Sequence, residues 1–364
     1  MSQAPLRVAV AGAGAFGKNH LRVYRELETA GLPVALVAAV EPDAARAAET
    51  VAKYAIPVFD TVDELLAADL HIDAATVAVP TVHHHAVAST LLDAGLDLLV
   101  EKPLAASLAE ADDLIARAER EKRILQPGHL ERFNPAVLAV QPQLRRPMFF
   151  ESHRLSIFTP RALDVDVVLD LMIHDLDIVL TFVASPVREV RAVGLPILSP
   201  RVDIANVRVE FESGCVANFT ASRVSTERVR KLRFFEPRQY VSIDYARQDL
   251  LVIKMDEGAG GTLPPEIAAA LASGKADPAL LARLAAARAA GPAPGLSFVK
   301  PPVTPGEPLR LEILSFLESV RTRREPLVTA RQGRDALALA LEIQASMAAH
   351  AQRAGLENFF NPGA

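Results

Sequence analysis

Leu6–Gly17 reads LRVAVAGAGAFG, and this stretch decides the fold of the first part of the chain. A short apolar run with β-branched residues ends at Gly12, and Gly14 and Gly17 follow at the spacing GxGxxG. Glycine tolerates positive φ angles and lets another group approach the backbone closely. A strand, such a loop and a helix predict the first unit of a Rossmann fold, whose helix N-terminus binds the pyrophosphate of a dinucleotide.

The sequence also predicts which dinucleotide binds. Glu41 ends the second apolar run, 24 residues after Gly17. A carboxylate at that place accepts hydrogen bonds from the ribose hydroxyls and repels a 2′-phosphate, and Pro42 stands where NADP enzymes often have a basic residue. We therefore expect NAD as the cofactor. The loop residues expected to hold it are Gly12, Gly14, Ala15, Phe16 and Gly17.

The glycine loop fits most of a second nucleotide motif as well. Gly12–Lys18 has the spacing GxxxxGK of the Walker A loop. That loop requires Ser or Thr at the next position to bind Mg²⁺, and the sequence has Asn19 there. We therefore reject the ATP-binding interpretation.

Up to residue 124, apolar strand patterns alternate with helix patterns. This alternation predicts a parallel sheet that is covered by helices on both faces. Two pairs, Thr61 with Glu64 and Ser107 with Glu110, have the spacing of a helix capping box. The expected strands are Leu6–Ala11, Val34–Val40, Ala74–Val79 and Leu96–Val100, and the expected helices are Asp43–Tyr54, one that ends at Ala94 and one that ends near Lys122.

After residue 124, strand patterns follow one another without helices between them, which predicts an α+β domain on a mainly antiparallel open sheet. We expect a Rossmann NAD-binding domain over residues 1–124 and a substrate and oligomerisation domain over 125–364. Within the latter, residues 257–305 are rich in Ala, Gly and Pro and form an expected insertion with a helix over Pro265–Ala290. The other expected elements are strands at Val187–Val193, Ala205–Phe211, Cys215–Ala221, Val229–Phe235, Tyr240–Ile243 and Leu250–Ile253, and helices at Asp166–Val183, Leu309–Arg323 and Gln332–Ala351.

Length and composition limit the partners. A chain of 364 residues suits two domains. Its net charge of -5 argues against nucleic acid or an anionic membrane as a partner. No run approaches the roughly 18 apolar residues of a spanning helix. The single cysteine, Cys215, excludes an internal disulfide and fits a reducing compartment, so we expect a cytoplasmic protein.

Four segments together resemble the Gfo/Idh/MocA oxidoreductases, which include glucose–fructose oxidoreductase and inositol dehydrogenase. The resemblance runs from about residue 6 to about residue 350. It implies an NAD-dependent dehydrogenase of a sugar hydroxyl that forms a homodimer or homotetramer through the sheet of its C-terminal domain. The segments are Gly17–His20 (GKNH), Val79–His84 (VPTVHH), Val100–Pro103 (VEKP) and Asp170–Asp175 (DLMIHD).

The resemblance also implies which residues flank the nicotinamide side of the cleft. Three histidines stand together in one of these segments, but adjacent residues on a helix point in different directions, so we expect no metal site. We interpret His83 and His85 as ordinary residues at a helix start. The residues implied at the cofactor, besides the loop and Glu41, are Pro80, Thr81, His84, Glu101 and Lys102.

Three residues are the expected catalytic group: Lys102, Asp170 and His174. Lys102 follows an apolar strand, and in a desolvated cleft its ammonium form is disfavoured, so it can share a proton with the reacting hydroxyl. Asp170 and His174 are spaced i, i+4 and share a helix face. Imidazole titrates near neutrality, so His174 can take the hydroxyl proton as the carbon releases hydride. Asp170 would orient that imidazole or contact the substrate.

Two further stretches are similar to one branch of the family, the bacterial 3-dehydrogenases of UDP-N-acetylglucosamine or the corresponding uronate. They are Gly128–Pro135 (GHLERFNP) and Ala221–Arg228 (ASRVSTER). The resemblance implies oxidation of the sugar at C3 and transfer of the 3-keto product to an aminotransferase, in lipid A or surface-polysaccharide synthesis. The residues implied at the substrate are Arg132, Asn134 and Arg223.

A basic segment follows Arg223 and can suit a diphosphate. Strand alternation would place Arg228 and Arg230 on one face and Lys231 and Arg233 on the other, so only some of them can reach a ligand. A solvated strand face explains the same charges equally well. Two other functions therefore stay open: an NAD-dependent dehydrogenase of a free sugar or polyol, and a non-catalytic NAD-binding regulator.

Overall fold

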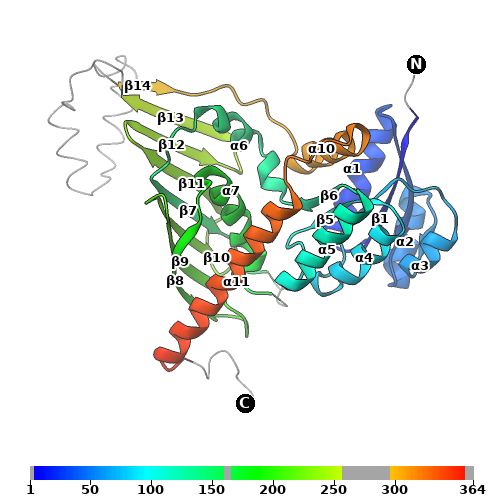
Figure 1. Ribbon diagram of the computed structural model, residues 1–364, viewed down its shortest axis with the longest axis horizontal. Helices are drawn as coiled ribbons and strands as arrows, with labels where there is room; N and C mark the ends of the chain where they lie inside the picture. Colours follow the sequence, from blue (N-terminus) through cyan, green and yellow to red (C-terminus); the bar gives the residue numbers. More distant parts are fainter. Residues whose placement is uncertain (1–3, 160–164, 256–295, 357–364) are drawn as a thin grey trace.

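The computed structural model describes residues 4–159, 165–255 and 296–356, which form two sheets with helices between and around them (Figure 1). The first sheet is parallel in the order β3-β2-β1-β4-β5-β6, so the Rossmann fold is confirmed. Its order reverses between β1 and β4, which is where such sheets bind dinucleotides. Its strands are β1 (Leu6–Ala11), β2 (Val34–Val40), β3 (Val58–Phe59), β4 (Ala74–Val77), β5 (Asp97–Glu101) and β6 (Leu125–Gly128).

Helices cover both faces of this sheet because its central strands are apolar on both sides. Three of the helices have an N-cap side chain that accepts a hydrogen bond from a backbone N–H of the first turn. These N-cap residues are Asp43, Thr61 and Ser107. These caps satisfy amides that the helix itself leaves unpaired. The helices are α1 (Gly17–Thr29), α2 (Ala44–Tyr54), α3 (Val62–Ala67), η1 (Thr81–His83), α4 (His84–Asp93) and α5 (Leu108–Glu121).

The second sheet has the order β14-β13-β12-β11-β7-β10-β9-β8, and only β7 and β10 pair in parallel. The mainly antiparallel sheet is therefore confirmed. The sequence pattern does not predict β7, although this strand lies near the middle of the sheet. The strands are β7 (Phe149–Leu155), β8 (Val187–Leu195), β9 (Ile204–Phe211), β10 (Val216–Ser222), β11 (Val229–Glu236), β12 (Gln239–Asp244), β13 (Asp249–Met255) and β14 (Leu296–Val299).

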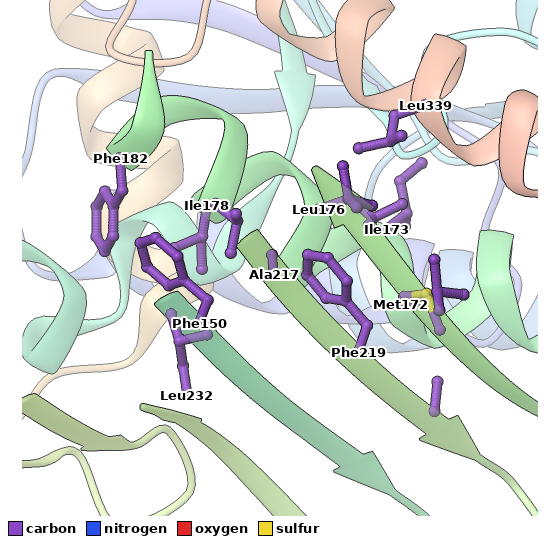
Figure 2. Packing of buried hydrophobic residues seen from close by; sticks show 14 of the residues in the cluster. Phe150, Met172, Ile173, Leu176, Ile178, Phe182, Ala217, Phe219, Leu232 and Leu339 are labelled. Atoms are coloured by element: carbon purple, nitrogen blue, oxygen red, sulfur yellow. The ribbon is translucent and has the colours of Figure 1, made fainter. Parts of the chain in front are cut away.

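One face of this sheet is buried under helices. Phe150 of β7 and Phe219 of β10 pack beneath α7, and Leu339 of α11 lies over that helix (Figure 2). Alternate side chains along each strand point to the opposite, uncovered face. The helices between β6 and β8 are η2 (Leu130–Phe133), α6 (Pro135–Val140), η3 (Gln141–Gln143), the π-helical turn η4 (Val168–Met172) and α7 (Ile173–Val183).

Some elements lie outside the domain limits expected from the sequence. β6 follows residue 124 but pairs with β5 in the first sheet. α10 (Pro308–Thr322) buries Ile313 and Phe316 in the same core as α1, and α11 (Ala330–Arg353) packs against both domains. β14 extends the second sheet, although it falls within the expected insertion 257–305. The helix expected over Pro265–Ala290 lies outside the described residues.

Candidate active site

The glycine turn after β1 needs glycine at two positions for steric reasons. Gly12 has φ +95°, and a Cβ there would lie 2.6 Å from the carbonyl oxygen of Ala78. A Cβ on Gly17 would lie 1.9 Å from the carbonyl oxygen of Gly12. A Cβ on Gly14 would meet no heavy atom within 4 Å, so the backbone there is open to an approaching ligand. This division of roles fits a turn that receives a pyrophosphate.

A cavity of about 650 Å³ adjoins this turn at the carboxyl ends of β1, β2 and β4. It lies at the switch point of the sheet, where a Rossmann fold binds a dinucleotide, and its residues suit the adenosine half of NAD. When bound, NAD supplies the hydride acceptor. Ala15 and Phe16 are exposed at the tip of the turn, and the Phe16 ring lies edge to face with His20. The lining includes Gly12, Gly14, Glu41, Arg46, Pro80 and His83.

Glu41 is 3% exposed and is held in place by three donors. Its Oε2 accepts the N–H of Ala13 (2.9 Å), and its Oε1 accepts the N–H of Asp43 (3.0 Å) and Nη2 of Arg46 (2.8 Å). Burial acts to raise the pKa of Glu41, but the bonds from Arg46 and the two amides outweigh it and keep the pKa below its usual value. A carboxylate has about four lone-pair sites, so a ribose hydroxyl can still bind it.

Lys102 directly follows β5 and reaches across to the second domain. Its Nζ donates to the carbonyl oxygens of Asp170 (2.6 Å) and Leu169 (3.4 Å) in η4, and lies 3.8 Å from Oδ1 of Asp170. Burial lowers the pKa of Lys102, against the opposing effect of the Asp170 and Glu101 carboxylates. The ammonium is therefore a better proton donor and the amine a more accessible base than for an exposed lysine.

His174 lies one turn beyond, but the structure pairs Asp170 with Lys102 and not with His174. Asp170 lies in the π-helical turn of residues 168–172, and His174 lies in the α-helix that follows. Nδ1 of His174 is buried without a partner among the described residues. Burial, and then Lys102 and Arg154, lower the pKa of His174 well below its ordinary value. The imidazole is therefore neutral at pH 7 and ready to accept a proton.

Glu101 and His84 organise the backbone around Lys102. Oε1 of Glu101 pairs with Nε2 of His20 (2.7 Å) inside the protein. The ring nitrogens of His84 pair with the carbonyl oxygens of Val79 (2.9 Å) and Pro103 (2.8 Å). His84 thus joins the two loops, and its expected place beside the nicotinamide stays a prediction. Pro80 lines the cavity, and Thr81 begins η1 beside it.

These features stand in a chain that matches two family models. The model of an oxidoreductase family with an NAD-binding Rossmann fold matches residues 6–129, and the model of the GFO/IDH/MocA C-terminal domain matches residues 136–238. The chain belongs to the Gfo/Idh/MocA oxidoreductases. It is therefore an NAD-dependent dehydrogenase that acts on a CH–OH group.

Several relatives share most of the length of this Gfo/Idh/MocA chain. UDP-N-acetylglucosamine 3-dehydrogenase of Acidithiobacillus ferrooxidans is 32% identical over 352 residues, which cover 96% of this chain and 99% of that protein. Its solved structure has a TM-score of 0.79 at 30% identity and covers 99% of this chain and 100% of that chain. The NAD-dependent scyllo-inositol 2-dehydrogenase of Bacillus subtilis is 26% identical over 235 residues, 60% of this chain and 68% of that protein.

The sequence did not predict that Arg46 lies beside Glu41 in the cavity, and this position bears on the cofactor preference. We expect NAD(H) to bind at least tenfold (~1.4 kcal/mol) more tightly than NADP(H), because Glu41 repels a 2′-phosphate. Glu41→Ala should reduce the difference between the two affinities, because it removes the carboxylate that repels the 2′-phosphate and frees the Arg46 guanidinium to bind that phosphate. Calorimetry on the purified protein measures both affinities. The double variant Glu41→Ala/Arg46→Ala is the control, and it should lose the gain in NADP affinity. Equal affinities in the wild type would contradict the role of Glu41.

The three residues expected at the substrate are buried and engaged within the protein. Arg132 bonds Thr181 and Asp177, and Nε of Arg223 donates to Asp203 (2.7 Å). Nδ2 of Asn134 donates to the carbonyl oxygen of Tyr245. Its Oδ1 accepts a hydrogen bond from a backbone N–H in the first turn of α6. These bonds give all three side chains a structural role, and their expected contacts with the substrate stay predictions. Their partners are distant in sequence, so the local motif did not reveal them.

A buried ion-pair network supports the second domain behind His174. The guanidinium of Arg154 donates to both oxygens of Asp175 (2.6 and 3.1 Å) and to Oε1 of Glu131 (2.9 Å). Arg154 also stacks over the Tyr245 ring at 5.0 Å. Because all partners are buried, loss of one would leave an unpaired charge at a cost of about 3–5 kcal/mol. The network fixes α7 relative to β7.

The strand alternation predicted for the basic segment is confirmed. Lys231 and Arg233 point to the uncovered face of the sheet, where they lie near Asp244 and Glu151. Arg230 points the other way. Its Nη1 lies 4.0 Å from Oε1 of Glu131, its charge acts on His174, and its side chain is 53% exposed. Arg230 is thus the accessible cation on the side of the candidate active site.

Among the described residues, no group of three side chains is suited to hold a metal ion. In the same part of the chain, no helix is long and apolar enough to cross a membrane.

Proposed function

We propose that this enzyme oxidises the C3 hydroxyl of UDP-N-acetylglucosamine to the 3-keto sugar nucleotide. The observation that supports this substrate most strongly is the full-length similarity to a UDP-N-acetylglucosamine 3-dehydrogenase. The exposed guanidinium of Arg230 adds a cation that suits a diphosphate. A free sugar would have no charge to pair with it.

We assign each residue of the catalytic group a distinct task, which the geometry around Lys102 supports. Neutral His174 accepts the hydroxyl proton while the C3 hydrogen leaves with its electron pair toward NAD, and the O–H electrons form the carbonyl. Lys102 hydrogen-bonds the same oxygen and stabilises the negative charge that develops on it. Asp170 and the η4 carbonyls hold the Lys102 ammonium in place.

The test is a comparison of substrates on the purified enzyme with NAD. UDP-N-acetylglucosamine should give a product two mass units lighter, trapped as an oxime or as the 3-amino sugar when an aminotransferase is added. Free N-acetylglucosamine and myo-inositol should be oxidised far more slowly. Rapid oxidation of myo-inositol with an inert UDP-sugar would overturn the proposal and favour a polyol dehydrogenase, the second candidate that the inositol dehydrogenase relatives support.

Arg230→Ala sharpens this test because it removes the cation assigned to the diphosphate. We expect KM for the UDP-sugar to rise about tenfold or more, since a charge-assisted hydrogen bond contributes ~1.5–3 kcal/mol. The matched variant is Lys231→Ala, one residue away on the opposite face of β11, which should leave KM near wild type. Equal effects of the two variants would contradict the assignment.

The product of this reaction needs an enzyme that consumes it. We propose that an aminotransferase consumes the 3-keto product, in lipid A or surface-polysaccharide synthesis in the cytoplasm.

We also propose a homodimer or homotetramer formed through the uncovered face of the second sheet. An aromatic cluster supports this interface: Phe235 lies 5.5 Å from Phe149 and 5.2 Å from Tyr240 between ring centroids, and all three side chains stay partly exposed. Sedimentation velocity would measure the assembly.

A further inference from the structure

His129 is a buried imidazole beside the catalytic group that the mechanism above does not use. It stands between β6 and η2, is 1% exposed, and neither ring nitrogen has a hydrogen-bond partner among the described residues. Its ring lies edge to face with that of His174, with 6.5 Å between the centroids. A buried polar group without a partner is costly and rare, so its place next to a candidate base needs a physical explanation.

The largest charge effects on the two rings differ. At His174 they come from cations: Lys102, Arg154 and Arg230, with His129 when it is protonated. At His129 they come from the Arg132 and Lys102 cations and from two carboxylates, Asp177 of α7 and Glu101 of β5. Burial lowers the pKa of both rings, and at His129 the two carboxylates oppose this effect. A proton is therefore more stable on His129 than on His174.

We infer that His129 is a positioning residue that takes up, through one bridging water molecule, the proton that His174 removes from the substrate. His174 Nε2 accepts the hydroxyl proton and its buried Nδ1 releases its own proton to His129, which leaves His174 neutral with its proton on Nε2. After the product leaves, the proton returns from His129 to Nδ1 and Nε2 releases its proton to solvent, which restores both rings. A water molecule can bridge two polar groups that make no direct hydrogen bond. The inference rests on the proposed role of His174 as the base, and it gives the proton a path away from a site that substrate and cofactor close.

The first test follows the two rings without any substrate. NMR of histidine-labelled protein, with signals assigned from His129→Gln and His174→Gln, should show that His129 gains its proton before His174 as the pH falls. In His129→Gln, the His174 ring should titrate at a higher pH than in the wild type, because a neighbouring positive charge is gone. Protonation of His174 first would overturn the inference.

The second test measures turnover. His129→Gln should lower kcat at least about tenfold, less than the ~10²–10⁴ of a group that touches the substrate. Added imidazole should restore part of the rate, because a small base replaces the missing proton acceptor. The control is His85→Gln, whose ring pairs with Asp113 at the surface and should not matter.

Full turnover in His129→Gln, or a loss that imidazole does not restore and that accompanies a lower melting temperature, would overturn the inference in favour of a structural role. If the wild type leaves UDP-N-acetylglucosamine untouched, the proposed function fails instead. The NMR titration and turnover with whichever sugar is oxidised still decide the role of His129.

Discussion

Lys102→Ala is expected to lower kcat by roughly 10²–10⁴ while NAD binding stays near wild type. The side chain lies between β5 and η4, outside the cavity that we assign to the adenosine half of the cofactor. Without it, the reacting oxygen loses its cationic partner, and the carbonyls of Leu169 and Asp170 lose a donor. Steady-state kinetics with calorimetry of NAD binding separates the two effects.

A matched variant tests whether the loss of any lysine charge lowers turnover. Lys18→Ala removes a lysine that pairs with Glu49 at the surface, and it should keep near wild-type turnover. Full activity of Lys102→Ala would remove Lys102 from the catalytic group. A parallel loss of NAD affinity would instead indicate that the loop around Glu101 and Pro103 had shifted.

Gly17→Ala and Gly14→Ala should differ sharply, although both add one methyl group to the same turn. The Cβ at position 17 would overlap a backbone oxygen at 1.9 Å, so the turn must shift. We expect a loss of stability of about 2 kcal/mol or more, in the range of overpacked interiors, and NAD affinity reduced more than about thirtyfold.

Gly14→Ala is the matched control, because its Cβ meets no atom of the free protein. Its melting temperature should equal that of the wild type, while NAD affinity falls because the methyl group lies where the pyrophosphate approaches the backbone. Differential scanning calorimetry and NAD titration measure both effects. Equal melting temperatures for the two variants would contradict the steric account of the turn.

Local patterns were enough to predict the glycine turn, Glu41 and most strands. They did not reveal the π-helical turn, because one extra residue per turn leaves no mark in the apolar pattern, and they did not predict that Asp170 lies beside Lys102. They also missed Arg46, which reaches the cavity from the first turn of α2 rather than from the position after β2.

Long-range partners explain the other differences. From the sequence alone, an arginine in a motif can be interpreted as a ligand contact, because its carboxylate partner in the fold is unknown. Arg223 pairs with Asp203, which lies twenty residues earlier in the chain. In the same way, the apolar stripe of α10 predicts a helix but does not say which core it covers. Only the folded chain shows that Ile313 and Phe316 complete the core of the first domain.

Transfer of deuterium from UDP-[3-²H]-N-acetylglucosamine to NAD tests whether the enzyme oxidises C3. We expect NADH that carries the deuterium, a primary isotope effect on the hydride-transfer step in single-turnover experiments, and no transfer in Lys102→Ala over the same time. Substrate deuterated at C4 serves as the control and should give unlabelled NADH. NADH that forms without deuterium from C3, or that takes its label from C4, would contradict oxidation at C3.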